Sequence, residues 1–137
     1  MSFLLDLFRW LLRAWPSRRA GLQVQYAPER DGDADPGEVV WTWVAYEDDP
    51  SQGKDRPVLV IGRWNGERVG LALTSKHNGR DDRVEVGAGA WDPSGAVSYA
   101  KLDRLVSLEA RPIRREGAIL DRRRFDAVVR AWRARPR

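Results

Sequence analysis

Apolar and β-branched residues occur in short runs, or alternate with polar residues, from residue 37 onward, and this pattern predicts β-strands. Asn65-Gly66 stands between two such runs and is a strong signal for a tight hairpin that joins Arg63–Trp64 to Arg68–Thr74. Glu47–Asp55 is polar and contains turn formers, so it is expected to be a loop. The other strands are expected at Val39–Tyr46, Val58–Gly62, Arg83–Val86, Ser98–Lys101 and Leu105–Leu108.

The segment from Asp121 to Arg133 has a helical period instead, which predicts an amphipathic helix that closes the domain. Asp121 is expected to cap its N-terminus. The apolar residues that share one face of this helix are Phe125, Val128, Val129 and Trp132. Several short strands and one closing helix predict a mainly β fold class with α-helix, in the form of a small, partly open SH3-like β-barrel.

The first twenty residues carry a second amphipathic pattern. Ser2–Trp15 is apolar except for a narrow polar stripe of Asp6, Arg9 and Arg13. The apolar face is expected to dock on the domain or on a second copy of the chain. Contact with a membrane surface through residues 2–15 is an alternative that we do not favour. The expected organisation is an N-terminal amphipathic helix at 1–20, a flexible linker at 21–36 and the barrel domain at 37–137.

Composition narrows the classes of function. The chain has 24 Lys+Arg against 20 Asp+Glu, a formal charge of +4 and a pI near 9.9, which is a mild bias toward polyanionic partners. The absence of cysteine excludes disulfides, cysteine-bound zinc and thiol catalysis, and the single histidine, His77, argues against a His-rich metal site or a Ser–His–Asp triad. No apolar run reaches the roughly 20 residues that span a bilayer, and Ser2–Trp15 is a poor signal peptide, so we expect a cytoplasmic protein.

Four of the seven tryptophans allow a positional prediction. Trp41 and Trp43 lie two residues apart in a predicted strand, so they share one face, and core packing is expected for both. Trp64 and Trp91 stand beside turn-forming residues and are expected to be more exposed. Either of these two could stack on a nucleic-acid base.

Several motifs follow one another in a fixed order along the last hundred or so residues. They are Gly37-Glu38-Val39-Val40-Trp41, then Gly53-Lys54-Asp55-Arg56-Pro57 before the apolar run from Val58, then Leu71-Ala72-Leu73-Thr74-Ser75-Lys76, then Lys101-Leu102-Asp103-Arg104, and finally a turn at Arg115-Glu116-Gly117-Ala118-Ile119-Leu120. The ordered series resembles the MazF/PemK family of toxins from type II toxin–antitoxin pairs. The first 36 residues fall outside the resemblance.

The resemblance implies an SH3-like barrel that forms a homodimer and cleaves single-stranded RNA at short sequences without a metal or another cofactor. It implies that Arg56 and Thr74 are the catalytic pair. It also implies that the loop Glu47–Asp55 gates RNA entry and is remodelled by a cognate antitoxin protein. Beside the catalytic pair, RNA contacts are expected from Gly53, Lys54, Trp64, Ser75 and Lys76.

The chemistry of the two catalytic side chains fits such a reaction. The 2′-hydroxyl of RNA can attack the adjacent phosphorus, and an enzyme must then align the attack and stabilise charge on the phosphoryl oxygens. Arg56 offers a planar fork of donors with a fixed charge, and Thr74 offers a hydroxyl that can donate to a phosphoryl oxygen or position the 2′-hydroxyl. A fixed-charge arginine is a poor base, so the group that removes the 2′-proton stays open. His77 is left out of the catalytic set.

Each assignment has a structural alternative. Arg56 could pair with Asp55 or Glu47 at a strand start, Thr74 could be an ordinary strand residue, and Lys76 could be a solvated loop lysine. Ser75 could take the place of Thr74 if the register is shifted by one. For the whole protein, the alternative is a non-catalytic SH3-like module that binds RNA or a protein, with membrane-surface association through the N-terminal helix as a variant of it.

Overall fold

The structure is a computed structural model of the chain, and it describes residues 21–29, 34–77, 79, 82–109 and 113–135. The amphipathic helix expected at 1–20 lies outside these residues, and so does the membrane contact considered for residues 2–15. Within the described ranges, no helix is long and apolar enough to cross a membrane.

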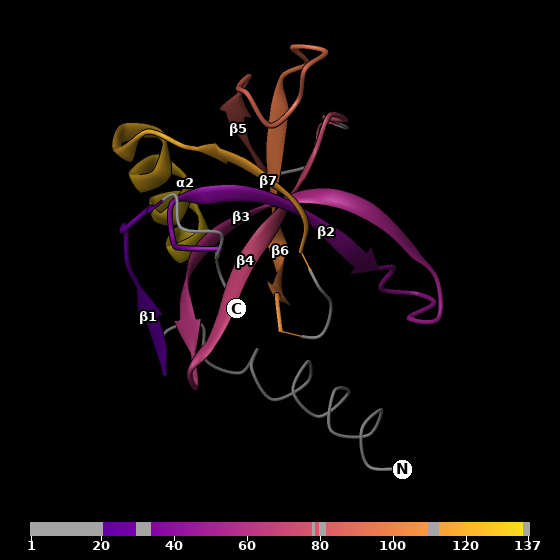
Figure 1. Ribbon diagram of the computed structural model, residues 1–137, viewed down its shortest axis with the longest axis horizontal. Coiled ribbons are helices and arrows are strands. Elements are labelled where there is room, and N and C mark those ends of the chain that lie inside the picture. Colours follow the sequence, from indigo (N-terminus) through magenta and orange to yellow (C-terminus); the bar gives the residue numbers. More distant parts are fainter. Residues whose placement is uncertain (1–20, 30–33, 78, 80–81, 110–112, 136–137) are drawn as a thin grey trace.

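Seven strands and one helix form the described part of the chain, and the strands belong to one antiparallel sheet that curls on itself (Figure 1). The elements are β1 (Leu22–Val24), β2 (Glu38–Ala45), β3 (Gly53–Trp64), β4 (Glu67–Thr74), β5 (Arg83–Gly87), β6 (Ser98–Ser107), β7 (Ile113–Ile119) and α2 (Arg122–Ala134). The sheet order is β5-β6-β4-β3-β2-β7, and β1 pairs with β3 outside this path. The predicted fold class, a mainly β half-open barrel with a C-terminal helix, is confirmed.

The hairpin between β3 and β4 forms at the predicted turn. Asn65 and Gly66 have φ angles of 51° and 82°, and a positive φ at both central residues is the mark of the type I′ turn. Glycine adopts this conformation without steric cost, and asparagine is one of the few other residues that tolerate it. The turn sets the pairing of Trp64 with Glu67, and an irregularity between Val60 and Gly62 then shifts the register by one residue, so that Val58 of β3 lies opposite Ala72 of β4.

One face of the sheet packs against α2, and we call this the helix-side core. From the helix it contains the four residues that the sequence predicts, Phe125, Val128, Val129 and Trp132. α2 begins where the Asp121 carboxylate accepts a hydrogen bond from the backbone N–H of Arg124 at 3.0 Å, so the predicted cap is also confirmed.

The opposite face of the sheet carries a second apolar cluster, which we call the pocket-side core. Successive residues of a strand point to opposite faces, so on β3 Leu59 and Ile61 belong to the helix-side core while Val58 and Val60 belong to the pocket-side core. Its buried members are Ala34, Val40, Val44, Val58, Val60, Ala72, Val106 and Leu108.

Three strands differ from the expectation. β3 begins at Gly53, so the predicted loop Glu47–Asp55 ends three residues early. β6 is one strand instead of two, because a register shift opposite Leu71–Leu73 takes up the polar residues in its middle. β7 forms where the sequence predicts a turn. Its run of charged residues shows no alternation of apolar and polar positions, but its backbone pairs with β2.

Trp91 is buried, and the prediction that it is exposed is wrong. Its side chain is 2% exposed, and its indole N–H donates to the Ser98 hydroxyl at 2.9 Å. The turn formers around it bend the chain so that the ring folds back over Gly89, where a Cβ would lie only 2.0 Å from a ring carbon. Trp41, Trp43 and Trp64 are half-buried, so the first two are not core residues, and Trp64 packs against the helix-side core.

Residues 21–29 are packed on the barrel, so the prediction of a flexible linker at 21–36 is wrong for them. β1 pairs with the end of β3. The Tyr26 ring lies edge-on to the Phe125 ring, with centroids 5.1 Å apart, and its hydroxyl donates to the Leu120 carbonyl at 2.7 Å. The prediction of a linker rests on the polar composition of residues 28–36. The residues before this segment have apolar side chains that pack against the helix-side core.

We predict that Tyr26→Phe lowers the free energy of unfolding by about 1 kcal/mol, because the buried Leu120 carbonyl loses its side-chain donor. Tyr26→Ala, which also removes the ring, should cost roughly 3 kcal/mol. Chemical denaturation of the full chain measures both. The control, Tyr46→Phe, removes a hydroxyl from a tyrosine that is 37% exposed and should change stability by less than about 0.5 kcal/mol. Equal stabilities for all of these variants would show that residues 21–29 do not pack as described.

Candidate nucleic-acid interface

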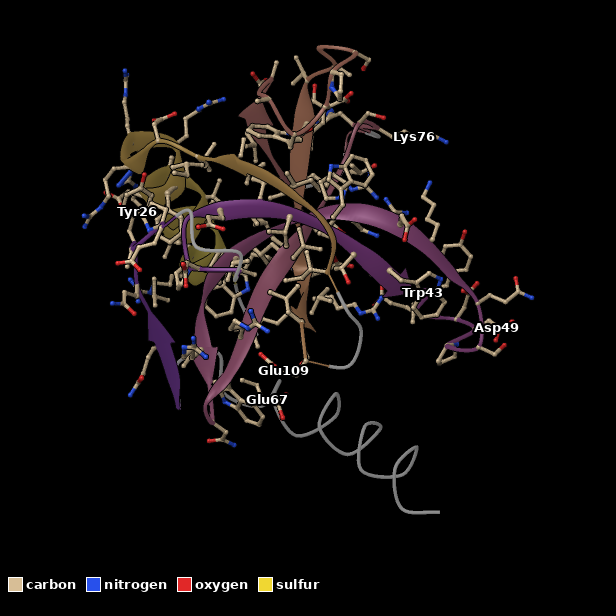
Figure 2. All side chains as sticks on the ribbon, viewed as in Figure 1. Tyr26, Trp43, Asp49, Glu67, Lys76 and Glu109 are labelled. Atoms are coloured by element: carbon tan, nitrogen blue, oxygen red, sulfur yellow. The ribbon has the colours of Figure 1, made fainter. Side chains whose placement is uncertain are left out.

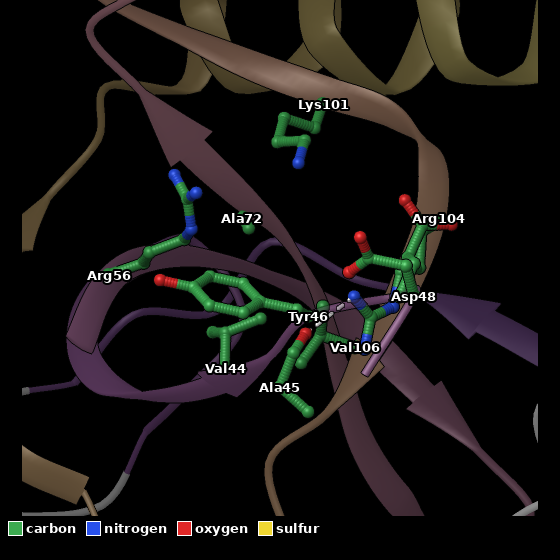
Figure 3. Close-up of a pocket in the computed structure, with 10 residues that line it drawn as sticks. Val44, Ala45, Tyr46, Asp48, Arg56, Ala72, Lys101, Arg104 and Val106 are labelled. Carbon is green, nitrogen blue, oxygen red and sulfur yellow. Dashed lines mark hydrogen bonds between the residues drawn. The ribbon is translucent and has the colours of Figure 1, made fainter. Parts of the chain in front are cut away.

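A pocket of about 370 Å³ lies where the ends of β2, β3, β4 and β6 meet, next to the β2–β3 loop (Figure 3). Val44, Ala72 and Val106 of the pocket-side core form its apolar part. The other lining residues are Ala45, Tyr46, Glu47, Asp48, Arg56, Lys101 and Arg104. A polar and charged rim over an apolar floor is the usual composition of a ligand site.

The register of β3 and β4 sets the relation between Arg56 and Thr74. Val58 pairs with Ala72, and two residues further along each strand the same face continues with Arg56 on β3 and Thr74 on β4. The two residues predicted to be catalytic therefore share one face of the sheet, just beyond the last residue pair of the β3–β4 ladder. Arg56 lines the pocket, whereas Thr74, two residues after the lining residue Ala72, is not among the lining residues. The Thr74 hydroxyl oxygen accepts a hydrogen bond from the Lys76 N–H at 3.2 Å, which leaves its hydrogen able to donate.

β6 brings two further cations to this pocket through its register shift. Leu102 and Leu105 both belong to the helix-side core although they are three residues apart, so the alternation of the strand changes phase between them. Lys101 precedes Leu102 and Arg104 precedes Leu105, and both consequently face the pocket. In a regular strand two residues three apart would point to opposite faces.

Arg104 also ties β6 to β2. Its guanidinium donates to the Ala45 carbonyl at 2.8 Å, although β4 and β3 lie between β6 and β2 in the sheet. Such a bond requires the sheet to curl, and it fixes the residue from which the β2–β3 loop departs. Asp49 lies in this loop, away from the body of the barrel (Figure 2).

Burial and like charges lower the pKa of two basic groups that line the pocket, Arg56 and Lys101. Burial lowers the pKa of Arg56, and the nearby charges of Arg83 and Arg104 lower it further, against an opposing effect of Tyr46. The pKa of Lys101 is likewise lowered, first by burial and next by Arg56. Asp103 acts against this shift without cancelling it. The site therefore disfavours its own positive charges.

Arg56, Arg83, Lys101 and Arg104, which we call the cation cluster, have no carboxylate partner within the part of the chain that the structure describes. None of them forms an ion pair within 4.0 Å with a described residue. Arg83 lies opposite Lys101 in the β5–β6 ladder and donates to the Lys76 carbonyl at 2.5 Å, while its Nε is buried without a hydrogen-bond partner. Buried charge without a partner is costly, so this arrangement suits an anion that supplies the missing charge.

The structure places the other expected RNA contacts in different surroundings. Gly53 opens β3, and a Cβ there would lie 2.3 Å from the Val44 carbonyl oxygen, so close packing alone requires glycine. Lys54 shares the face of Arg56 and is exposed. Ser75 and Lys76 are exposed in the turn after β4, where Lys76 points outward (Figure 2). Trp64 lies eight residues from Arg56 on β3, roughly 26 Å away along an extended strand, so it does not join the pocket.

The structural alternative for Arg56 is not supported in the described residues. No ion pair joins it to Asp55 or Glu47. Asp55 follows the alternation of β3 onto the face opposite to Arg56 and is not among the charges that shift the pKa of Arg56. The ring of His77 lies 4.8 Å from that of Tyr99, outside the pocket lining. Among the described residues, no group of three or more His, Asp or Glu side chains could hold a metal ion.

Sequence reasoning did not select Tyr46, Arg83, Lys101 or Arg104 as site residues. The spacing of Lys101 and Arg104 favours opposite faces for any regular strand. The one signal available is the pair Leu102 and Leu105, whose three-residue spacing is incompatible with a uniform strand that has one buried face.

Comparisons with known proteins identify the family of the chain and similar solved structures. Residues 35–134 match the family described as PemK-like, MazF-like toxin of type II toxin–antitoxin system. Among solved structures, the chain is similar to a chain of the MazE–MazF complex (form II) from Deinococcus radiodurans, with 23% identity and a TM-score of 0.49 over 76% of this chain and 90% of that one. No curated protein matches the sequence significantly.

We predict that Lys101→Met raises the melting temperature, because it removes a half-buried ammonium beside Arg56 and Arg83 while keeping an unbranched side chain. A gain of up to about 1 kcal/mol is typical of stabilising surface-charge changes. The pKa of Lys101 is lower in the folded chain than its usual 10.5, so the penalty is fully present below the folded value and disappears as the pH rises past 10.5.

Thermal unfolding of the parent and the variant at two pH values tests this prediction. Lys54→Met, which removes an exposed lysine of β3, is the matched control and should change stability by less than about 0.5 kcal/mol. A melting temperature of Lys101→Met below that of the parent would contradict the account of the cation cluster.

Proposed function

The chain belongs to the PemK-like, MazF-like toxins of type II toxin–antitoxin systems, and we propose that it is an endoribonuclease that cleaves single-stranded RNA at short sequences by attack of the 2′-hydroxyl, without a metal. The observation that carries this proposal is the cation cluster beside the pocket, four basic side chains without a carboxylate partner among the described residues. RNA supplies the matching anion in every phosphodiester, and positive charge placed at a phosphate is the main aid to reactions at phosphorus.

In the proposed reaction the 2′-oxygen forms a bond to the adjacent phosphorus and the bond from phosphorus to the 5′-oxygen breaks. The 2′-hydroxyl loses its proton, the departing 5′-oxygen gains one, and the products carry a 2′,3′-cyclic phosphate and a 5′-hydroxyl. Arg56 stabilises the charge on the phosphoryl oxygens, since its guanidinium forms paired hydrogen bonds to such oxygens. Thr74, on the same face of the sheet as Arg56, donates to a phosphoryl oxygen or holds the 2′-hydroxyl in line.

The apolar part of the pocket gives the bases of RNA a place to bind. Val44, Ala72 and Val106 offer an apolar surface next to the Tyr46 ring, which stands beside Arg56 (Figure 3). Bases of single-stranded RNA stack on aromatic side chains and bury their faces on apolar surface. A base seated here would place its phosphate against the basic rim.

We further propose that the protein acts in the cytoplasm as a homodimer and is neutralised by a cognate antitoxin. Membership of a toxin–antitoxin family supports the antitoxin partner. The β2–β3 loop, with Glu47 and Asp48 at the pocket, is the segment that such a partner would displace or hold.

Incubation with a long single-stranded RNA in EDTA tests the activity. We predict cleavage at a short recurring sequence, with 2′,3′-cyclic phosphate ends. Arg56→Ala and Thr74→Ala should lower the cleavage rate by roughly 10²-fold or more, the loss expected for one stabilising donor. Thr74→Ser keeps the hydroxyl and should retain most of the activity.

Arg130→Ala is the control, because it removes an exposed arginine of α2 at a distance from the pocket and should cut as the parent does. Circular dichroism establishes that every variant is folded. Cleavage by Arg56→Ala and Thr74→Ala at the parental rate would overturn the assignment of the site. An intact parent protein that binds RNA and leaves it uncut, with or without metal, would favour the non-catalytic binding module instead.

A further inference from the structure

Lys101 faces the pocket because β6 is irregular at this point, and a lysine on the solvated surface would not require such an irregularity. The change of phase between Leu102 and Leu105 turns it toward the pocket, and Figure 3 shows its ammonium and the Arg56 guanidinium directed into the same space from β6 and β3. It is half-buried, and none of the described residues is its hydrogen-bond or ion-pair partner.

The groups that face Lys101 do not neutralise it. Arg56 of β3 and Arg83 of β5 disfavour its charge, and Asp103 of β6 and Glu47 of the β2–β3 loop favour it. No ion pair joins Asp103 to Lys101, and one Asp103 carboxylate oxygen is buried without a hydrogen-bond partner. With burial included, the positive form is disfavoured on balance. A ligand anion would reverse that balance.

We propose that Lys101 is a second phosphate-binding residue, which holds the phosphodiester at Arg56 together with that arginine. This inference rests on the proposed function for the identity of the phosphodiester, and it gives a role to a lysine that the sequence analysis did not predict to be a site residue. A lysine acts here as a movable point charge with three donors, next to the planar fork of the arginine. Two cations on one phosphate would also supply charge from two sides during the reaction.

The affinity of the site for an anion should depend on pH. The anion binds to the protonated form of Lys101, so affinity should fall as the pH rises through the pKa of this lysine, which lies below the usual 10.5. Arginine keeps its charge throughout this range, so Lys101→Arg should bind with a weaker dependence on pH than the parent. Any contribution of Tyr46, which also faces the site, remains in Lys101→Arg and is therefore subtracted by the comparison.

The test uses a fluorescent oligo(dA) single strand of 12 nucleotides, which lacks the 2′-hydroxyl and cannot be cleaved by this route, and which has no group that titrates between pH 7 and pH 10. Fluorescence anisotropy with the full chain measures its affinity. We expect Lys101→Met to weaken binding about tenfold, the effect of one hydrogen bond to a charged group, and to make the dependence on salt shallower. Lys101→Arg should retain the affinity at pH 7.

The control Arg123→Met removes an equal charge from the exposed side of α2 and should leave the affinity within about twofold of the parent. Parental affinity and salt dependence in Lys101→Met would overturn the inference. So would a loss in Lys101→Arg as large as that in Lys101→Met, because a lost phosphate contact is rescued by charge and a packing defect is not. Cleavage of long RNA, measured in parallel, separates the claims: a parent that binds oligo(dA) through Lys101 but never cuts RNA refutes only the proposed function.

Discussion

The hydrogen bond from the Arg104 guanidinium to the Ala45 carbonyl, 2.8 Å long, is the constraint around which the pocket forms. It links β6 to β2 across two intervening strands, so it exists only if the sheet curls. The curl brings the basic side chains of β6 over the apolar floor that β2, β3 and β4 provide, within reach of Arg56. The curl of the sheet thus determines both the shape of the barrel and the position of the pocket. The phase change in β6 makes this curl possible.

The cation cluster lowers the stability of the folded chain. Charges of one sign, partly removed from water and without a carboxylate partner among the described residues, destabilise the folded chain relative to one with neutral side chains. Functional sites are the usual place for such local conflicts between stability and chemistry. In this protein the conflict is relieved when an anion binds, and the gain in charge compensation adds to the affinity for that anion.

The sequence predicted correctly those elements that are determined by neighbouring residues in the chain. Asn65-Gly66 sets its own turn, and Asp121 with its apolar stripe sets α2. The elements that were missed depend on distant partners: β7 pairs with β2 despite its charges, and Trp91 turns inward because a serine on β6 accepts its N–H. The family resemblance pointed to Arg56 and Thr74, and the alternation of β3 and β4 beyond the pair Val58–Ala72 puts them on one face of the sheet. Lys101 could not be found this way, because only the phase change in β6 turns it toward Arg56.

The central claim is that the cation cluster binds an anion, and a titration with sulfate followed by nuclear magnetic resonance tests it most directly. Sulfate remains a dianion near neutral pH and mimics the charge and shape of a phosphate. The account predicts saturable shifts of the Arg56 and Arg104 guanidinium signals and of the backbone amides around Lys101. Shifts that are absent there, or that are largest for the exposed arginines of α2 such as Arg123 and Arg130, would contradict it.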